Sequence, residues 1–263
     1  MGFPYKQIFE KSEETLLAYG SKHMAVEEIQ ANLDEFKTYE HRRLSDDDYF
    51  SIMIAIIFYS GFKAAIVTAK MEVIKRHFPS WEIVAGYTQQ DISSILSDSK
   101  MIRNRRKIEA CAYNAKLFDS IVSKHGSFQN YIDSFKPYDS FENLMLLKGD
   151  LKNRFQYLGK VTVYHFLTDM GFPVIKPDRV ICRIFYRLGV IDDEDQLLDT
   201  VIQGRNFAEA VGKPIRYIDI VFVAYGQAQS LEFGIDQGIC LKQPRCQFCG
   251  LTELCRYYMA IKA

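Results

Sequence analysis

Four cysteines near the C-terminus have the types and spacing of a metal-binding loop. They follow one another as C-x5-C-x2-C-x5-C, at Cys240, Cys246, Cys249 and Cys255. Four thiolates so close together in the sequence can enclose one metal centre, which is either a [4Fe-4S] cluster or a structural zinc ion. Zinc sites usually present two close pairs of ligands, whereas here a single CxxC lies between two wider gaps. We therefore predict a [4Fe-4S] cluster, with zinc as the less favoured occupant.

Disulfide bonds are the alternative use of these cysteines. They are typical of small secreted scaffolds, whereas this chain has 263 residues and an N-terminus that does not resemble a signal peptide. The two cysteines outside the cluster, Cys111 and Cys182, are expected to be small buried hydrophobes. We expect a reducing compartment, and hence a cytoplasmic or nucleoid-associated protein.

The composition is that of a globular protein. Hydrophobic residues make up 48% of the chain and charged residues 25%. The longest apolar run, Ile52 to Tyr59, is much shorter than the roughly 20 residues that cross a bilayer. We therefore expect a folded core and no interaction with a membrane.

The charges are balanced overall but unevenly distributed. The formal net charge is zero, yet residues 1–50 carry 6 Lys or Arg against 11 Asp or Glu. Residues 146–187 carry 8 basic against 3 acidic side chains, and residues 238–263 carry 4 against 1. A locally basic face on a neutral protein is compatible with DNA binding through a small footprint.

The pattern of apolar residues predicts an all-α fold. Apolar side chains recur at spacings of three and four in two long stretches, at Ile102, Ile108, Ala112, Ala115, Leu117 and Phe118, and at Leu144, Leu147, Leu151, Phe155 and Leu158. Strand signals are weak, and short breaks with Gly or Pro separate helices of ordinary length. No internal repeat or low-complexity linker interrupts the pattern.

A helix-hairpin-helix is predicted in the basic middle region. One helix would end near Phe155 and the next would begin near Thr162, whose hydroxyl can cap it. Amide N–H groups in such a tight turn form a small anion pocket that suits a DNA phosphate without reading sequence. The candidate DNA-binding residues are Leu158, Gly159, Lys160, Val161 and Thr162. An ordinary αα-hairpin is the alternative.

A glycine- and proline-containing loop follows the hairpin and ends at Asp178. The segment Gly171 to Asp178 reads GFPVIKPD. With the hairpin before it and the four cysteines after it, this order resembles the helix-hairpin-helix DNA glycosylase superfamily. Some members of that superfamily, such as endonuclease III, end in a four-cysteine iron-sulfur loop. The resemblance implies that Asp178 is the catalytic carboxylate; the alternative is a plain helix N-cap after Pro177.

The middle of the chain has a closer resemblance. The segment Met101 to Glu109, MIRNRRKIE, continues to Asn114-Ala115 and to Gly126-Ser127-Phe128, and it resembles 3-methyladenine DNA glycosylase I from about Asp48 to Asp178. Two positions depart from that branch, because Ile56 replaces its base-recognising glutamate and Ala64 an expected aromatic residue. That branch also uses zinc, whereas this chain has the four-cysteine loop.

The chemistry that the resemblance implies is hydrolysis of an N-glycosidic bond in double-stranded DNA with a damaged base. The damaged nucleotide must be flipped out of the duplex, and the carboxylate of Asp178 would stabilise the positive charge that builds on the sugar. Related glycosylase/lyases attack with a hairpin lysine, but here that place is taken by Val161, and Lys160 would point about 100° away. We therefore expect a monofunctional enzyme of base excision repair, with an alkylated purine as substrate.

Aromatic residues and a basic run are further candidates for contacts with DNA. Phe58, Tyr59 and Phe62 lie where the related branch forms its base pocket, although most of the 19 Phe and 16 Tyr in the chain must be core residues. The RNRRK run from Arg103 to Lys107 either contacts phosphates or is a solvated helix face.

The predicted architecture is two helical lobes with the active cleft between them. Residues 48–165 would form the central lobe, which ends in the hairpin, and residues 1–47 and 166–263 would form a second lobe with the four-cysteine cluster loop. We expect a monomer. One alternative is a non-catalytic iron-sulfur module that binds DNA lesions, in which Asp178 has no chemical role. Another is a zinc-stabilised interaction protein, which would be colourless rather than brown.

Overall fold

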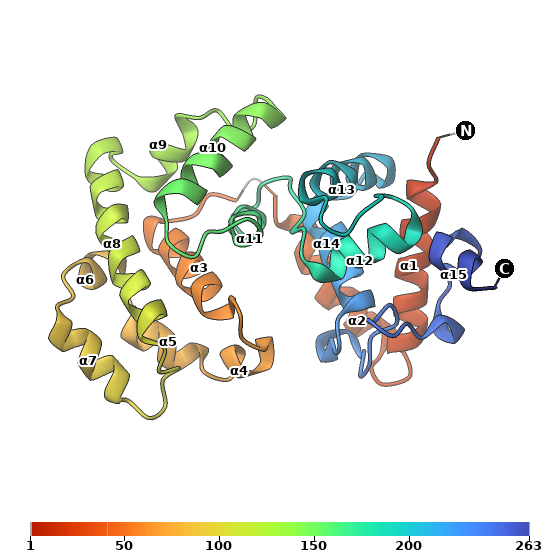
Figure 1. Ribbon diagram of the computed structural model, residues 1–263, viewed down its shortest axis with the longest axis horizontal. Helices are drawn as coiled ribbons and strands as arrows, with labels where there is room; N and C mark the ends of the chain where they lie inside the picture. Colours follow the sequence, from red (N-terminus) through yellow and green to blue (C-terminus); the bar gives the residue numbers. More distant parts are fainter. Residues whose placement is uncertain (1, 41, 263) are drawn as a thin grey trace. The chain divides into compact units, whose positions relative to one another are not determined.

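The computed structural model describes residues 2–40 and 42–262, and within these ranges the protein is helical without any β-strand (Figure 1). A single isolated β-bridge joins Ser230 and Ile235. The all-α prediction is therefore confirmed. No helix in the described ranges is long and apolar enough to cross a membrane.

The chain divides into two compact units. One unit consists of residues 42–170, and the other combines residues 1–41 with residues 171–263. The sequence placed these boundaries at 47/48 and 165/166, six and five residues from where they lie.

The unit of residues 42–170 is built around two long helices. Its helices are α3 (Asp46–Tyr59), α4 (Ala64–Thr68), α5 (Met71–His77), α6 (Trp81–Ala85), α7 (Gln89–Ser97), α8 (Arg105–His125), α9 (Phe128–Asp133), α10 (Phe141–Arg154) and α11 (Thr162–Asp169). Helix α8 packs against α3, α6, α7 and α9, while α11 packs against α3 and α10. Stacked rings of Phe118 and Phe128, with centroids 4.4 Å apart, lie in the core between α8 and α9.

The ends of α8 follow from local sequence. The side chain of Asn104 accepts a hydrogen bond from the Lys107 amide and so caps the first turn. The helix ends at Gly126, whose φ of 84° lies in the left-handed region that glycine adopts without strain. The length of 21 residues that results places one face of α8 on α3 and leaves another open to solvent.

The second unit surrounds a core of aromatic and branched residues. Its helices are α1 (Tyr5–Gly20), α2 (Val26–Asp34), η1 (Glu35–Thr38), α12 (Arg179–Leu188), α13 (Leu197–Val211), α14 (Ile215–Gly226), η2 (Leu231–Phe233), η3 (Cys246–Phe248), η4 (Thr252–Leu254) and α15 (Arg256–Lys262). Helices α1, α13 and α14 pack on one another, and α12 packs on α14. A Cβ atom at Gly226 would lie 2.7 Å from Val180 and Ile184, so glycine allows the close approach of α14 to α12.

Lys107 is a buried amine that joins α8 to the end of α3. Its side chain is only 3% exposed, and its Nζ donates hydrogen bonds to the carbonyl oxygens of Ile57 and Ser60, the latter at 2.6 Å. The last carbonyls of a helix have no intrahelical partner, and a positive charge at a helix C-terminus is favourable. The amine also lies over the rings of Phe62, at 5.4 Å, and Tyr157, at 4.5 Å. Lys107 therefore ties together the end of α3 and the segment after α10.

Replacing this amine by an apolar side chain of similar length should weaken the unit. We expect Lys107→Met to lower the free energy of unfolding by about 1–3 kcal/mol, because two buried carbonyl groups lose their donor. Arg105→Met on the same helix is the control, since Arg105 makes only an exposed ion pair with Glu109. Denaturant unfolding of both variants tests the expectation, and equal midpoints for parent and Lys107→Met would contradict it.

The same variant should change how stability depends on pH. Burial lowers the pKa of Lys107 to about 8 from its ordinary value of 10.5. Between these pH values the unfolded chain binds more protons than the folded one, so the contribution of Lys107 to the free energy of unfolding rises with pH. The difference between parent and Lys107→Met should grow from pH 8 to pH 10.5.

Candidate functional site

Asp178 is the N-cap of α12 in the second unit. Its Oδ1 accepts hydrogen bonds from the amides of Val180, at 2.8 Å, and Ile181, at 3.1 Å. Its Oδ2 forms an ion pair with the Lys176 Nζ at 3.1 Å, and the carboxylate side chain is 25% exposed. Burial lowers the pKa of Lys176, but the charges of Asp178 and Asp219 outweigh burial and leave that pKa above its ordinary value. The carboxylate is thus held in one orientation beside a charged lysine.

The loop that leads to Asp178 is fixed from two sides. The amide of Lys176 donates to Oδ1 of Asp219 at 3.4 Å, and Asp219 is completely buried and paired with Arg216. On the other side a Cβ atom at Gly204 would lie 2.5 Å from Ile175, so α13 is in close contact with the loop. Asp178 therefore sits on a well-supported segment rather than on a free loop.

The predicted hairpin is present in the other unit, with a different cap. Helix α10 ends at Arg154 and α11 begins at Thr162, as the sequence indicated. The sequence predicted that the Thr162 hydroxyl caps α11, but it does not. Instead, this hydroxyl accepts a hydrogen bond from the Gly159 amide at 2.7 Å and donates one to the Tyr157 carbonyl at 2.5 Å. The reason is that Tyr157 has a positive φ of 65°, which curls the turn back onto Thr162.

The hairpin leaves amide groups available. In the described parts of the chain, the amides of Lys160, Val161 and Thr162 have no protein acceptor. Gly159 and Lys160 are exposed, whereas Leu158 is 1% exposed and contributes its side chain to the core. The turn therefore presents adjacent N–H donors to solvent, with an exposed lysine among them.

The buried residue Asn114 fixes the entry to the hairpin. Its Nδ2 donates to the carbonyl of Gln156 at 3.0 Å, and its Oδ1 accepts from the Gln156 amide at 2.9 Å. Together with Lys107 below the Tyr157 ring, this bidentate contact anchors the hairpin to α8.

The three aromatic residues predicted to form a base pocket are in different environments. Phe58 is 0% exposed and packs against Phe78 at a centroid distance of 5.8 Å, so it has no free face on which a base can stack. Its place on the inner face of α3 accounts for the difference. Tyr59 is half-buried and bonded to Thr68, and Phe62 is half-buried near the amine of Lys107.

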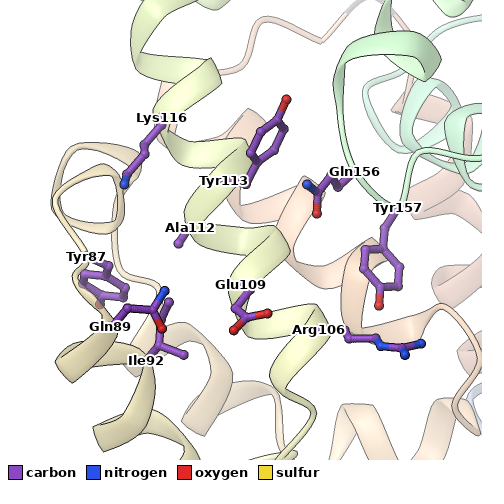
Figure 2. Close-up of a pocket in the computed structure, with 10 residues that line it drawn as sticks. All are labelled: Tyr87, Gln89, Ile92, Arg106, Glu109, Ala112, Tyr113, Lys116, Gln156 and Tyr157. Atoms are coloured by element: carbon purple, nitrogen blue, oxygen red, sulfur yellow. The ribbon is translucent and has the colours of Figure 1, made fainter.

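The residues of the basic run Arg103 to Lys107 also differ in their exposure to solvent. Arg103, Arg105 and Arg106 are exposed, whereas Lys107 is buried. A cavity of about 570 Å³ lies beside this run, lined by Arg106 and Tyr157 among others (Figure 2). None of the three predicted aromatic residues lines it. The basic run, which contains Arg106, was the sequence signal for this part of α8, whereas the tyrosines that line the cavity were not predicted.

No disulfide bond joins any of the six cysteines in the described part of the chain, so the disulfide alternative finds no support here. Two buried or half-buried side chains donate to the cluster cysteines: Arg187 to Sγ of Cys240 at 3.3 Å, and the Tyr225 hydroxyl to Sγ of Cys249 at 3.0 Å. Arg187 also donates to the carbonyl of Leu241, and Arg183 to that of Cys240. These arginines hold the loop against α12.

The donor set suits a soft, negatively charged centre. Burial raises the pKa of the Cys246, Cys249 and Cys255 thiols, and the charge of Cys240 adds to the rise in each. The Arg187 guanidinium supplies positive charge beside them. Among the described residues, no three His, Cys, Asp or Glu side chains are placed to hold a single metal ion. The cluster stays a prediction.

Solved structures of DNA glycosylases share the fold. Endonuclease III in a trapped covalent complex with DNA aligns with a TM-score of 0.56 at 16% identity, over 90% of this chain and 98% of that one. The 8-oxoguanine glycosylase/lyase of Methanocaldococcus jannaschii in complex with DNA aligns with a TM-score of 0.54 at 16% identity, over 83% of this chain and 96% of that one. The predicted helix-hairpin-helix glycosylase fold is confirmed.

Sequence comparisons show to which family of glycosylases the chain belongs. A DNA-3-methyladenine glycosylase of Haemophilus influenzae is 26% identical over 129 residues, and the match covers 43% of this chain and 70% of the relative. The sequence model of the methyladenine glycosylase family matches residues 34–182, more than half of the chain, and this range includes the hairpin and Asp178. The chain therefore belongs to the methyladenine glycosylase family.

Proposed function

We propose that this DNA glycosylase of base excision repair releases an alkylated purine by hydrolysis and leaves the DNA strand uncut. The observation that carries the proposal is the family match over residues 34–182, which joins the hairpin and Asp178 in one homologous segment. The alkylated substrate is supported by the name of the Haemophilus influenzae relative and by chemistry, since alkylation weakens the glycosidic bond and such a base needs little further activation. A cationic base can also be bound by stacking on aromatic rings.

The environment of Asp178 supports a role in stabilising charge. Two amides and Lys176 orient its carboxylate, so it need not reorganise when positive charge develops on the sugar. A water molecule then completes hydrolysis, because Val161 stands where lyases of the superfamily carry their nucleophilic lysine. The ion pair with Lys176 and the cap also give Asp178 a structural role, and this favours the non-catalytic lesion-binding module as the second candidate function.

Asp178→Asn separates these two candidates. Asparagine is as good an N-cap as aspartate, so the fold should persist, while removal of the charge should slow base release by orders of magnitude and leave binding to lesion DNA intact or tighter. The measurement is release of base from duplexes that contain 3-methyladenine and other lesions, followed by alkali or heat to cut abasic sites. Borohydride should trap no covalent adduct with the parent enzyme.

Asp192→Asn is the matched control, since Asp192 is an exposed carboxylate of the same unit, with a side chain 87% exposed. It should be as active as the parent. If Asp178→Asn were equally active, Asp178 would lose its catalytic role; if the parent released no base from any lesion, the lesion-binding module would be the better description.

The hairpin should bind DNA through its backbone. Its free amides and the nearby Lys148, Lys152, Arg154 and Lys160 predict an affinity that falls with rising salt and depends little on sequence. A Cβ atom at Gly159 would meet only the Thr162 hydroxyl, at 3.7 Å, so the fold tolerates a side chain there and the DNA phosphate is the group that would be displaced.

We expect Gly159→Val to weaken binding of lesion-bearing and undamaged duplexes by a similar factor. Fluorescence anisotropy with both duplexes at several salt concentrations measures this. Gly149→Val is the control, because a Cβ atom at Gly149 in α10 meets nothing within 4 Å. Loss of binding to the lesion duplex alone would place the turn in the base pocket instead.

The cysteine loop is proposed to hold a [4Fe-4S] cluster that orders the C-terminal part of the protein. When bound, such a cluster links four thiolates that few other contacts would hold together. Arg187 and Tyr225 would then donate hydrogen bonds to its cysteine ligands.

Protein purified without oxygen should be brown and contain about four irons and four acid-labile sulfides per chain. Cys249→Ser should lose most of the iron, whereas Cys182→Ala, outside the loop, should keep it. Elemental analysis and the visible spectrum give the result, and one zinc per chain without sulfide would show that the site is a zinc site.

A further inference from the structure

The cavity beside α8 is a groove that belongs wholly to the unit of residues 42–170. Its floor is one face of α8, with Arg106, Glu109, Tyr113 and Lys116 at spacings of three and four (Figure 2). Tyr87 lies on one side, and Gln156 and Tyr157 lie on the other. The volume of about 570 Å³ is in the range of ligand sites in proteins.

The polar side chains of the floor are available to a ligand. In the described ranges, the side chains of Arg106, Tyr113 and Lys116 have no hydrogen bond or ion pair. The one acid, Glu109, is paired with Arg105 at 3.3 Å, which offsets its charge. The groove therefore has two unpaired cations and favours an anionic ligand.

The spacing of these cations suits a short polymer rather than a single anion. Ten residues of helix separate Arg106 from Lys116, which is about 15 Å at 1.5 Å per residue. Successive phosphates of one strand rise about 3.4 Å along the axis of a stacked DNA helix and lie farther apart in an unstacked strand, so roughly four nucleotides or fewer span this distance.

Three tyrosine side chains also line the groove. Tyr113 is 49% exposed, and no residue of its own unit forms a hydrogen bond with its hydroxyl. Tyr87 and Tyr157 are half-buried. A positively charged groove with exposed rings is how proteins bind single-stranded nucleic acid without sequence preference, because every base has a face that can stack. A duplex hides these faces, so unpaired bases are the ligand that the rings select.

The groove is continuous in sequence with the hairpin. Gln156 and Tyr157 line the groove, and the next residues, Leu158 and Gly159, begin the turn. Asn114 and Lys107 hold Gln156 and Tyr157 on α8, which fixes the groove relative to the hairpin amides. A strand whose phosphate is bound at the hairpin can thus extend along α8.

We propose that the groove along α8 binds a short unpaired stretch of DNA next to the duplex held by the hairpin. The proposal rests on the proposed function only for the choice of DNA as the polymer. It gives this enzyme a preference for lesions close to strand ends, gaps or other single-stranded sites.

Anisotropy measurements with undamaged DNA test the proposal. One probe is a blunt duplex, and the others are the same duplex extended by about four unpaired thymidines at its 3′ or 5′ end. Wild-type protein should bind at least one extended duplex about tenfold more tightly than the blunt one, which is the effect of one stacked base. Tyr113→Ala should remove this difference without changing the affinity for blunt duplex. The double variant Arg106→Gln with Lys116→Gln should lower the affinity for the extended duplex by a larger factor than the affinity for the blunt one.

Tyr138→Ala is the matched control, since Tyr138 is an exposed tyrosine of the same unit, at 45%, away from the groove. It should keep the preference. Equal affinity of the wild type for all probes would overturn the proposal, as would an equal loss of blunt and extended binding in Tyr113→Ala. A protein that prefers unpaired extensions but releases no base would contradict the proposed function and leave the groove assignment standing.

Discussion

Buried main-chain groups of irregular segments must find hydrogen-bond partners, and in this all-helical protein the side chains of neighbouring helices supply them. Lys107 satisfies the carbonyls at the end of α3, and Asn114 bonds both polar groups of Gln156 before the hairpin. In the cysteine loop, Arg187 donates a hydrogen bond to the carbonyl of Leu241. The segments to which we assign function are thus the ones that depend on single long side chains for their shape.

Helix α12, which has ten residues, carries several of these side chains. Asp178 begins it, and Arg183 and Arg187, one turn apart, reach the main chain of the cysteine loop from it. The same helix therefore carries the candidate carboxylate and holds the candidate cluster loop.

The sequence predicted the all-α class, the position of the hairpin and the ends of its helices, because periodicity and turn residues are local signals. It did not predict which aromatic residues are accessible. Phe58 and Phe62 are four residues apart and chemically alike, yet the first lies in the core and the second beside a buried amine. The charged run likewise gave no sign that Lys107 points inward while its neighbours are exposed. Such choices depend on how α3, α8 and the hairpin pack, which a single stretch of sequence does not contain. The role of Thr162 was missed for a similar reason, because it follows from the left-handed backbone of a tyrosine, a residue that seldom adopts it.

Helix α1 packs against α13 and α14, which follow the central unit in the chain, whereas residues 42–170 form a unit from one uninterrupted stretch. At about 5–20 residues per second, roughly ten to thirty-five seconds pass between the synthesis of α1 and that of α13. During this time the central unit can fold while α1 waits with its apolar face uncovered. Helix α1 is therefore open to chaperones and proteases during this time, although six of its residues are buried in the finished molecule.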